Sequence, residues 1–280
     1  MKINVICSDQ GWVYSKFITE FRKYSKNQIL LNSKEKCDVI HCLPYYEISA
    51  NTEHPCTVWL SHQEHKRKDL HDKFIDAAKN ADIAISQSKK YADLMISQGI
   101  KNVVQIVPGV DLNRFSLRSS ERQQKDRLVI GYVGRQYSST DRKNPKLLER
   151  ISKLPFVEFR ATGGLVREAD LPRFYASLDL VVSPATIEGG PMAIQESLAV
   201  GTPIMCFADV GMANEFVAGV FKAEFGNDDD FVRRLEEFWT NKDYLTFRKF
   251  DVMRNLRKQV EQFTWERFAL EHDKIWAKIK

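Results

Sequence analysis

Short apolar runs and longer amphipathic stretches alternate along most of the 280-residue chain. The runs are rich in Val, Ile and Leu and lack a polar face, which is typical of buried parallel strands. They predict strands over about 2–8, 37–42, 56–60, 80–86, 103–107, 128–134, 157–161, 180–182 and 202–207. Apolar residues three and four apart predict helices over about 12–25, 145–152, 192–200, 229–240 and 264–276. This alternation predicts an α/β protein with parallel sheets.

A polar segment without any period, residues 116–127, separates two such series. We interpret it as a linker between two Rossmann-like domains, residues 1–115 and residues 128–262. The last segment, 263–280, predicts one amphipathic helix with Thr264 as its N-cap.

The stretch 179–207 predicts a strand, a Gly-rich turn, a helix and a second strand. Pro191 stands where a first helical residue is favoured, and Gly201 is typical of a helix C-cap. Gln195 is expected to point outward from this helix. Backbone amides in a turn with few side chains, at the positive end of a helix, suit an anion and above all a phosphate.

Two carboxylates accompany this turn, with Glu188 inside it and Glu196 eight residues later in the helix. Carboxylates accept hydrogen bonds from sugar hydroxyls and are poor partners for phosphate. Together the features indicate a ligand with a phosphate part and a polyol part. An ordinary crossover helix with an exposed glutamate is the alternative.

The composition, with 43% apolar and 28% charged residues, is that of a globular protein, and no apolar run approaches the roughly 20 residues that span a bilayer. The five cysteines form no Cys-x-x-Cys pair, so we expect reduced thiols and no metal site. The net charge is +5, and residues 1–120 hold 17 Lys and Arg against 13 Asp and Glu. This basic half could meet a membrane surface, a nucleic acid or an acidic acceptor, or could simply be solvated.

The spacing Glu188-x7-Glu196, with Gly-Gly-Pro after the first glutamate and Ala-Val-Gly-Thr-Pro shortly after the second, resembles the Glu-x7-Glu motif of GT-B glycosyltransferases, most closely family 4. The resemblance implies that Glu188 contacts the donor sugar and that Glu196 contacts the ribose hydroxyls. It implies that sugar or phosphate oxygens of the donor are bound by the turn Gly189, Gly190, Pro191 and Met192.

The strand 128–134 ends in Gly134-Arg135, and Lys143 follows after a polar loop. This resembles the family's Gly-Arg…Lys pair, which implies that Arg135 and Lys143 clamp the donor diphosphate and act in catalysis together with Glu188. Fixed cations would stabilise the charge that builds on a leaving diphosphate, Arg as a planar fork and Lys as a point charge. Arg142 in place of Lys143, or two exposed basic side chains without a role, are the alternatives.

Three further positions resemble donor contacts of the family. Gly163 belongs to a turn that resembles the one beside the nucleotide base, and Gly11 resembles the glycine of the first loop near the donor phosphates. His62 follows the strand 56–60, where open α/β sheets bind ligands, and resembles a histidine near the donor sugar. A plain tight turn is the alternative for Gly11, and a surface or capping histidine is the alternative for His62.

The resemblance implies a GT-B fold, with two Rossmann-like domains whose parallel sheets face each other across a donor cleft and a C-terminal helix, 263–280, that crosses back to the first domain. It implies a retaining, metal-independent hexosyltransferase without a cofactor, which moves a sugar from a nucleoside-diphosphate-sugar to a hydroxyl acceptor. We expect a cell-surface glycan or a lipid-linked sugar as acceptor, in polysaccharide biosynthesis, and a cytoplasmic protein that can lie at the inner membrane surface.

Other functions stay open from the sequence. The acceptor could be hydroxymethylated viral DNA, which the basic first half would suit. The chain could also be a non-catalytic relic that binds a nucleotide-sugar, or a GT-B sugar-nucleotide epimerase or phosphorylase. The oligomeric state is not predicted.

Overall fold

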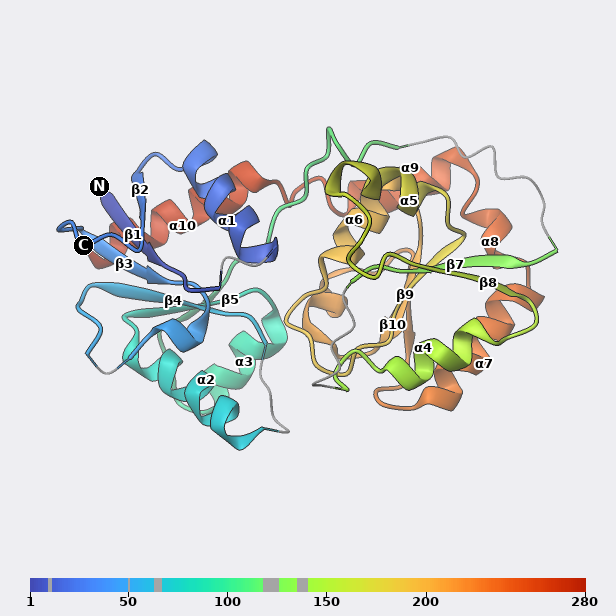
Figure 1. Cartoon of the computed structure of the whole chain (residues 1–280), viewed down its shortest axis with the longest axis horizontal. Coiled ribbons are helices and arrows are strands. Elements are labelled where there is room, and N and C mark those ends of the chain that lie inside the picture. The colour runs from blue at the N-terminus through green and yellow to red at the C-terminus, as the bar shows by residue number, and fades with distance from the viewer. Residues whose placement is uncertain (10–11, 50, 63–66, 118–125, 135–140) are drawn as a thin grey trace. The chain divides into compact units, whose positions relative to one another are not determined.

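The computed structural model describes residues 1–9, 12–49, 51–62, 67–117, 126–134 and 141–280. The chain divides into two compact units: unit 1 is residues 1–109 with 263–280, and unit 2 is residues 110–262 (Figure 1). The change from one unit to the other falls at Gly109–Val110. Of the segment 116–127 interpreted as a linker, residues 118–125 lie outside the described residues.

Unit 1 is built on a parallel sheet of six strands in the order β2-β1-β3-β4-β5-β6. The strands are β1 (Lys2–Ile6), β2 (Gln28–Leu31), β3 (Val39–Cys42), β4 (Cys56–Leu60), β5 (Ile83–Ser86) and β6 (Val103–Gln105). Its helices are α1 (Trp12–Tyr24), the 3-10 helix η1 (Tyr45–Glu47), α2 (Lys68–Asn80), α3 (Lys89–Ser97) and α10 (Trp265–Ile279). The apolar pattern does not predict β2, because this edge strand is only partly buried and begins with the polar Gln28.

Helix α10 packs on α1 through aromatic side chains, although the two are far apart in sequence. The rings of Phe21 and Phe268 stack at 5.2 Å, and the ring of Phe17 lies 5.0 Å from that of Phe268. The helix begins at its cap, since the Thr264 hydroxyl accepts a hydrogen bond from the Arg267 amide at 3.1 Å. Trp276 also reaches the sheet, where its indole N–H donates to the Thr57 hydroxyl at 3.2 Å.

Unit 2 has a second parallel sheet, of five strands in the order β11-β10-β9-β7-β8. Its strands are β7 (Leu128–Tyr132), β8 (Val157–Ala161), β9 (Leu180–Ser183), β10 (Ile204–Phe207) and β11 (Val220–Ala223). Its helices are α4 (Pro145–Ser152), α5 (Leu171–Ala176), α6 (Met192–Val200), α7 (Asp228–Thr240), α8 (Asp243–Thr246) and α9 (Phe250–Lys258), with the 3-10 helices η2 (Glu168–Asp170) and η3 (Gly211–Glu215).

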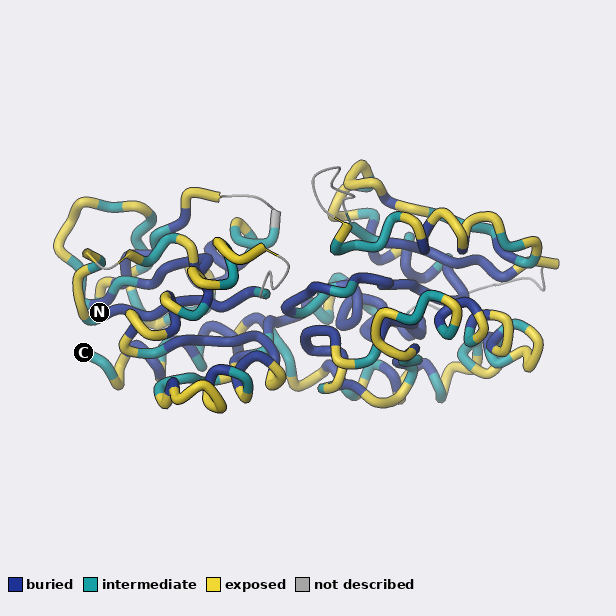
Figure 2. The backbone as a smooth tube through the Cα atoms, turned by 90° about the horizontal axis from the view of Figure 1, so that it is seen from below, coloured by how far each residue is buried: buried dark blue, intermediate teal, exposed yellow. Residues whose placement is uncertain are grey.

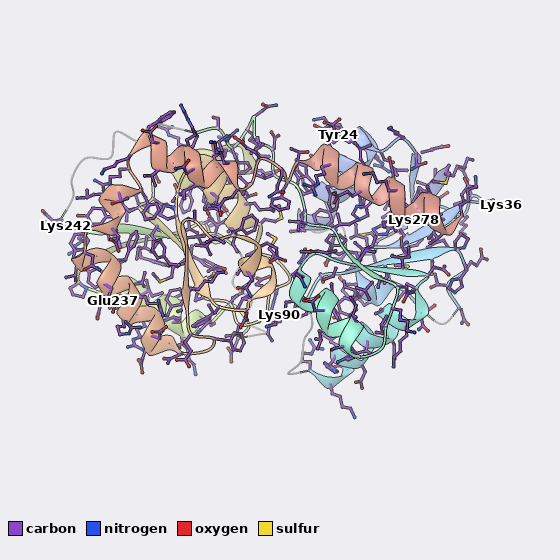
Figure 3. All side chains as sticks on the ribbon, turned by 180° about the vertical axis from the view of Figure 1, so that it is seen from behind. Tyr24, Lys36, Lys90, Glu237, Lys242 and Lys278 are labelled. Carbon is purple, nitrogen blue, oxygen red and sulfur yellow. The ribbon has the colours of Figure 1, made fainter. Side chains whose placement is uncertain are left out.

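Buried residues run through the interior of each unit, as the dark blue stretches of Figure 2 show. Every residue of β7, β9 and β10 is buried, which agrees with their uninterrupted apolar runs. Exposed charged side chains such as Lys36, Glu237 and Lys242 point away from the ribbon (Figure 3). Within the described residues, no helix combines the length and the apolar character that crossing a bilayer requires. The predicted α/β class with two Rossmann-like domains is confirmed.

Buried polar contacts anchor the elements of unit 2. The Arg257 guanidinium donates to the carbonyls of Ala199 and Leu112, each at 2.8 Å, and so ties the end of α6 to the start of the unit. Asp179, which precedes β9, accepts from the Val129 amide of β7 at 3.0 Å and pairs with Arg248 at 2.8 Å. These contacts hold the central strands and α6 in one rigid arrangement.

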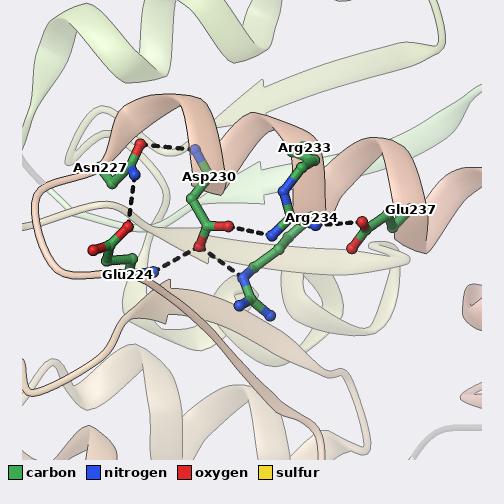
Figure 4. A network of polar contacts seen from close by, with 6 residues as sticks. All are labelled: Glu224, Asn227, Asp230, Arg233, Arg234 and Glu237. Carbon is green, nitrogen blue, oxygen red and sulfur yellow. Dashed lines mark hydrogen bonds and ion pairs between the residues drawn. The ribbon is translucent and has the colours of Figure 1, made fainter.

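The start of α7 carries a network of polar contacts (Figure 4). The Asn227 side chain accepts from the Asp230 amide at 3.0 Å, which makes it the N-cap. The Asp230 carboxylate accepts from Arg234 Nε at 2.8 Å and from the Glu224 amide at 2.7 Å, and it also pairs with Arg233. The Arg234 contact and the other donors hold the pKa of Asp230 well below its usual range. This network fixes the turn between β11 and α7.

Candidate functional site

The strand order of the sheet in unit 2 has a topological switch point at β7. Along the chain, β8 lies on one side of β7, and the next strand, β9, lies on the other side. The loops that follow β7 and β9 therefore diverge at the carboxyl edge of the sheet, which is where open α/β sheets bind ligands. Lys143 lies in the first of these loops and Glu188 in the second. The topology thus predicts the ligand site at the place that the motifs indicated.

Lys143 and Glu188 form an ion pair between these two loops. Arg142 adds a second positive charge, with its Nη1 atom 3.6 Å from Glu188 Oε2. The backbones are joined as well, because the Thr186 amide donates to the Arg142 carbonyl at 2.9 Å. None of the three charged side chains is more than 18% exposed. Charges that are largely removed from water are costly unless they are paired, and here the pair joins the two loops of the predicted site.

The surroundings of Lys143 lower the pKa of its ammonium group. Burial, with the positive charge of Arg142 as a further cause, lowers the pKa of Lys143 to about 7. A lysine with this pKa gains positive charge readily when an anion arrives near neutral pH. A lysine whose charge is sensitive to its surroundings therefore lies beside the carboxylate of Glu188.

The turn Glu188–Gly190 is shaped by close packing against η3. Gly211 has φ +52°, and a Cβ atom on it would lie 2.4 Å from the Gly189 carbonyl oxygen. A Cβ atom on Gly190 would lie 2.7 Å from the Met212 sulfur. Position 211 therefore requires glycine, whereas a side chain at position 190 would require Met212 to shift. The sequence analysis missed Gly211, and the signal was a glycine directly beyond the strand β10.

Helix α6 begins at Met192 with Pro191 as its N-cap residue and ends at Gly201, which has φ +84° as expected for a C-cap. No acidic residue occupies its first turn, so its positive end keeps its attraction for an anion. The expectation that Gln195 points outward is wrong, since Gln195 is fully buried. The reason is that α6 packs against α5, α9, β9 and β10, and eight consecutive residues from Ala193 to Val200 are buried.

Glu196 is buried in α6 and has a partner that the sequence analysis did not find. The Tyr175 hydroxyl, at the end of α5, donates to Glu196 Oε2 at 2.7 Å. Burial and the Glu196 charge raise the pKa of Tyr175 well above its usual value, so Tyr175 stays a hydrogen-bond donor. The contact joins two helices that are 21 residues apart, and no local pattern marks it.

The ends of β7 and β8 are linked in the same region. The Gly134 amide donates to the Thr162 hydroxyl at 3.2 Å, and the Thr162 amide donates to the Tyr132 carbonyl at 3.1 Å. Gly163 follows with φ +56°, and a Cβ atom on it would meet nothing within 4 Å. This turn therefore borders open space.

Most of the predicted site residues thus gather at one edge of unit 2. The structure brings to the carboxyl side of its strands Gly134, Lys143, Gly163, Glu188, Gly189, Gly190, Pro191, Met192 and Glu196. Arg135 and Gly11 lie outside the described residues. His62 follows β4 of unit 1, next to Ser61, whose carbonyl accepts from the Gln87 amide group at 2.9 Å. The roles that the sequence analysis assigned to these residues, in both units, stay predictions.

Solved structures with this arrangement are GT-B glycosyltransferases, and this is the fold class of the chain. Sucrose-phosphate synthase from Thermosynechococcus elongatus is 14% identical, with a TM-score of 0.74 over 99% of this chain and 98% of that chain. Anabaena Alr3699/HepE in complex with UDP and glucose is 14% identical, with a TM-score of 0.75 over 99% and 100% of the two chains. S. aureus TarM, in complex with fondaparinux, alpha-GlcNAc-glycerol and UDP, is 14% identical, with a TM-score of 0.65 over 85% of this chain and 55% of that chain.

The family described as glycosyl transferases group 1 matches residues 117–260, which is more than half of the chain. The chain belongs to this family. No curated protein sequence matches it.

Proposed function

We propose that the chain is a retaining glycosyltransferase, similar to family 4, that moves a sugar from a nucleoside-diphosphate-sugar to an acceptor hydroxyl. One observation carries this proposal above the others. Lys143 and Glu188 form a buried ion pair at the point where the sheet of unit 2 reverses, beside the positive end of α6. A cation, a helix N-terminus and a carboxylate at one place suit a ligand with a diphosphate and a sugar.

Lys143 is proposed to bind the donor diphosphate, together with Arg135. A diphosphate that approaches Lys143 competes with Glu188 for the ammonium group and stabilises its charged form. Release from this pair leaves Glu188 to accept hydrogen bonds from the donor sugar. The amides of the first turn of α6, which begins at Met192, add partial positive charge for sugar or phosphate oxygens.

Glu196 is proposed to accept hydrogen bonds from the two ribose hydroxyls. The Tyr175 hydroxyl donates to one of its carboxylate oxygens at 2.7 Å, which fixes the rotamer of Glu196. Tyr175 is thus a positioning residue for Glu196. The turn at Gly163, which borders open space, is proposed to lie beside the base.

The proposed reaction follows from these contacts. The bond between the sugar C1 atom and the β-phosphate oxygen breaks, and the electron pair stays on the diphosphate, where Lys143 and Arg135 stabilise it. The acceptor hydroxyl attacks C1 from the face that the diphosphate leaves, and its proton passes to a phosphate oxygen. The products are the glycoside with retained configuration and a nucleoside diphosphate. In this mechanism side-chain cations stabilise the leaving group, so the reaction is proposed to need neither a metal ion nor a cofactor.

The proposed base is uracil, because Alr3699/HepE and TarM were solved with UDP. The proposed acceptor is a cell-surface glycan or a lipid-linked sugar. The TarM complex with a GlcNAc-glycerol supports an acceptor of this kind.

The donor proposal is tested by thermal unfolding with UDP, GDP, ADP and dTDP, and with their glucose conjugates, in the presence of EDTA. A nucleotide at 100 times its dissociation constant adds about 2.7 kcal/mol, which raises the Tm of a chain of this size by roughly 5–10 °C, at about 2–4 °C per kcal/mol. We expect the uridine compounds to raise the Tm of the wild type. The variant Glu196→Gln should lose most of this rise in Tm. Glu236→Gln, on an exposed face of α7, is the matched control and should respond like the wild type. No stabilisation by any of these nucleotides would contradict the proposal.

A further inference from the structure

Three potential metal ligands meet in unit 1, at the amino end of its strands. His54 precedes β4, Cys56 is the first residue of β4, and Asp82 directly precedes β5. Their donor atoms all lie within 4.8 Å of one another. They belong to the edge of the sheet opposite to the one that carries the predicted ligand loops, so donor binding does not account for this cluster.

The contacts inside the cluster are short. His54 Nδ1 lies 2.8 Å from Asp82 Oδ2 and 3.6 Å from Cys56 Sγ. The same imidazole nitrogen thus faces a carboxylate and a thiol at once. A proton on Nδ1 can form one good hydrogen bond, with the Asp82 carboxylate. The same proton then forms no good hydrogen bond with the Cys56 thiol.

Two of the three groups are held in place by the sheet. The Cys56 amide donates to Asp82 Oδ2 at 2.7 Å, and the Asp82 amide donates to the Cys56 carbonyl at 3.0 Å. The Asn102 side chain donates to the Asp82 carbonyl at 2.5 Å. Cys56 is fully buried and its thiol points toward the histidine. Cys56 and Asp82 are therefore already held in position without a bound ion.

The separation of His54 and Cys56 fits the bond lengths of zinc. With Zn–N of about 2.0 Å and Zn–S of about 2.3 Å, the 3.6 Å between His54 and Cys56 corresponds to an angle of about 110° at the metal, close to tetrahedral. The 2.8 Å between nitrogen and carboxylate oxygen is slightly short for two ligands of one ion. His54 has room to adjust, since its side chain is 56% exposed.

We propose that His54, Cys56 and Asp82 form a binding site for a zinc ion, with water as the fourth ligand. A nitrogen, a sulfur and an oxygen donor together favour Zn²⁺ over Mg²⁺ or Ca²⁺, which prefer oxygen ligands alone. Zinc would displace the thiol proton of Cys56, and His54 would bind the ion through Nδ1 with its own proton on Nε2. Because the ion would join the starts of β4 and β5, its role is to stabilise unit 1 and is separate from the proposed sugar transfer.

The sequence analysis expected no metal site, because the cysteines show no paired spacing. His54 and Cys56 are two residues apart, but Asp82 joins them only through the pairing of β4 with β5. A ligand set of this kind is visible only in the folded chain.

The proposal is tested on the full chain with Co²⁺ and Zn²⁺ added to reduced, metal-free protein. We expect one equivalent of Co²⁺ to produce a thiolate-to-cobalt charge-transfer band in the near ultraviolet, and Zn²⁺ to abolish it by displacement. Zn²⁺ should also raise the Tm of the wild type.

Two variants and one control make the assignment specific. Cys56→Ser should lose the charge-transfer band, and His54→Ala, at an exposed position that leaves the core intact, should lose the rise in Tm. Cys37→Ser changes a thiol outside the cluster and should behave like the wild type. Absence of the band in the wild type, or a band that Cys56→Ser keeps and Cys37→Ser loses, would overturn the proposal.

Discussion

Both units bury polar side chains, but the two groups differ in charge. In unit 1, between the sheet and α10, the cluster of His41, Thr57, His272 and Trp276 is uncharged. In unit 2, Lys143, Glu188 and Glu196 are buried charges at the edge of the sheet. A neutral group costs little to bury once it is hydrogen-bonded, whereas a buried charge costs several kcal/mol even when it is paired. The comparison supports the proposal that unit 2 keeps the charges of Lys143, Glu188 and Glu196 for a ligand, whereas the neutral cluster of unit 1 contributes to stability. Asp179, which pairs with Arg248, is a buried charge of unit 2 with a structural role.

The two histidines of the unit 1 cluster are hydrogen-bonded and buried. His41 Nδ1 lies 2.8 Å from the Thr57 hydroxyl, and His272 Nδ1 donates to the Phe268 carbonyl at 2.8 Å. Burial lowers the pKa of His272 to about 4 and places the pKa of His41 well below its usual value. Both rings are therefore neutral at physiological pH and pack with the aromatic side chains of α1 and α10.

The largest effect is expected from removing the charge of Lys143. Lys143→Met keeps most of the side-chain volume but removes the cation that the mechanism places on the leaving diphosphate. We expect kcat to fall about 10²–10³-fold, as when one oxyanion donor is lost in other enzymes. Lys146→Met, on the exposed face of α4, is the control and should keep wild-type turnover. Wild-type kcat in Lys143→Met, measured by release of nucleoside diphosphate, would remove the catalytic role of this residue.

The second effect concerns the stability of unit 1. Above pH 6.5, His272 is neutral in the folded and in the unfolded chain; below it, only the unfolded chain binds the proton until the pH reaches about 4. The free energy of unfolding should therefore decrease as the pH falls from 6.5 to 4, by about 3 kcal/mol in total from this residue. His272→Leu should remove this part of the pH dependence. Urea unfolding of both proteins at several pH values measures it, and parallel curves would show that His272 is not buried as a neutral group.

The smallest effect is expected at Tyr175, which supports a buried charge of unit 2. Tyr175→Phe removes the hydrogen bond to Glu196, and a bond to a charged group contributes about 1.5–3 kcal/mol. We expect the Kd for the donor nucleotide to rise by about tenfold while kcat changes little. Tyr244→Phe, a buried tyrosine between α7 and α9, is the control. Calorimetric titration measures the Kd of both variants. Equal Kd values for Tyr175→Phe and Tyr244→Phe would show that Tyr175 does not contribute to donor binding.

The fold was predictable because its signals are local. Strand, Gly-rich turn and helix follow one another within residues 180–200, and Thr264 marks the start of α10 by its own hydrogen bond. The alternation of such strands and helices predicts the two parallel α/β units. The gathering of Lys143 with Glu188 was suggested by the motifs, but their direct pairing was not.

The rest depends on contacts between distant segments. Tyr175 reaches Glu196 from another helix, and Gly211 packs against the Gly189 backbone from beyond β10. Gln195 is buried in a helix that packs against α5, α9, β9 and β10. None of these follows from a local pattern, since a side chain in a helix carries no signal of what will cover it. Edge strand β2 was missed for the opposite reason, because too little of it is buried to produce an apolar run.

The central claim is that the buried charges of unit 2 mark the donor site, and hydrogen exchange with mass spectrometry tests it most directly. The account predicts that saturating UDP slows amide exchange in peptides covering residues 186–196, and that Lys143→Met weakens this protection at the same nucleotide concentration. Peptides from the neutral cluster, residues 265–279, should exchange at the same rate with and without UDP. Unchanged exchange over residues 186–196 at saturating UDP, with protection confined to other segments, would contradict the account.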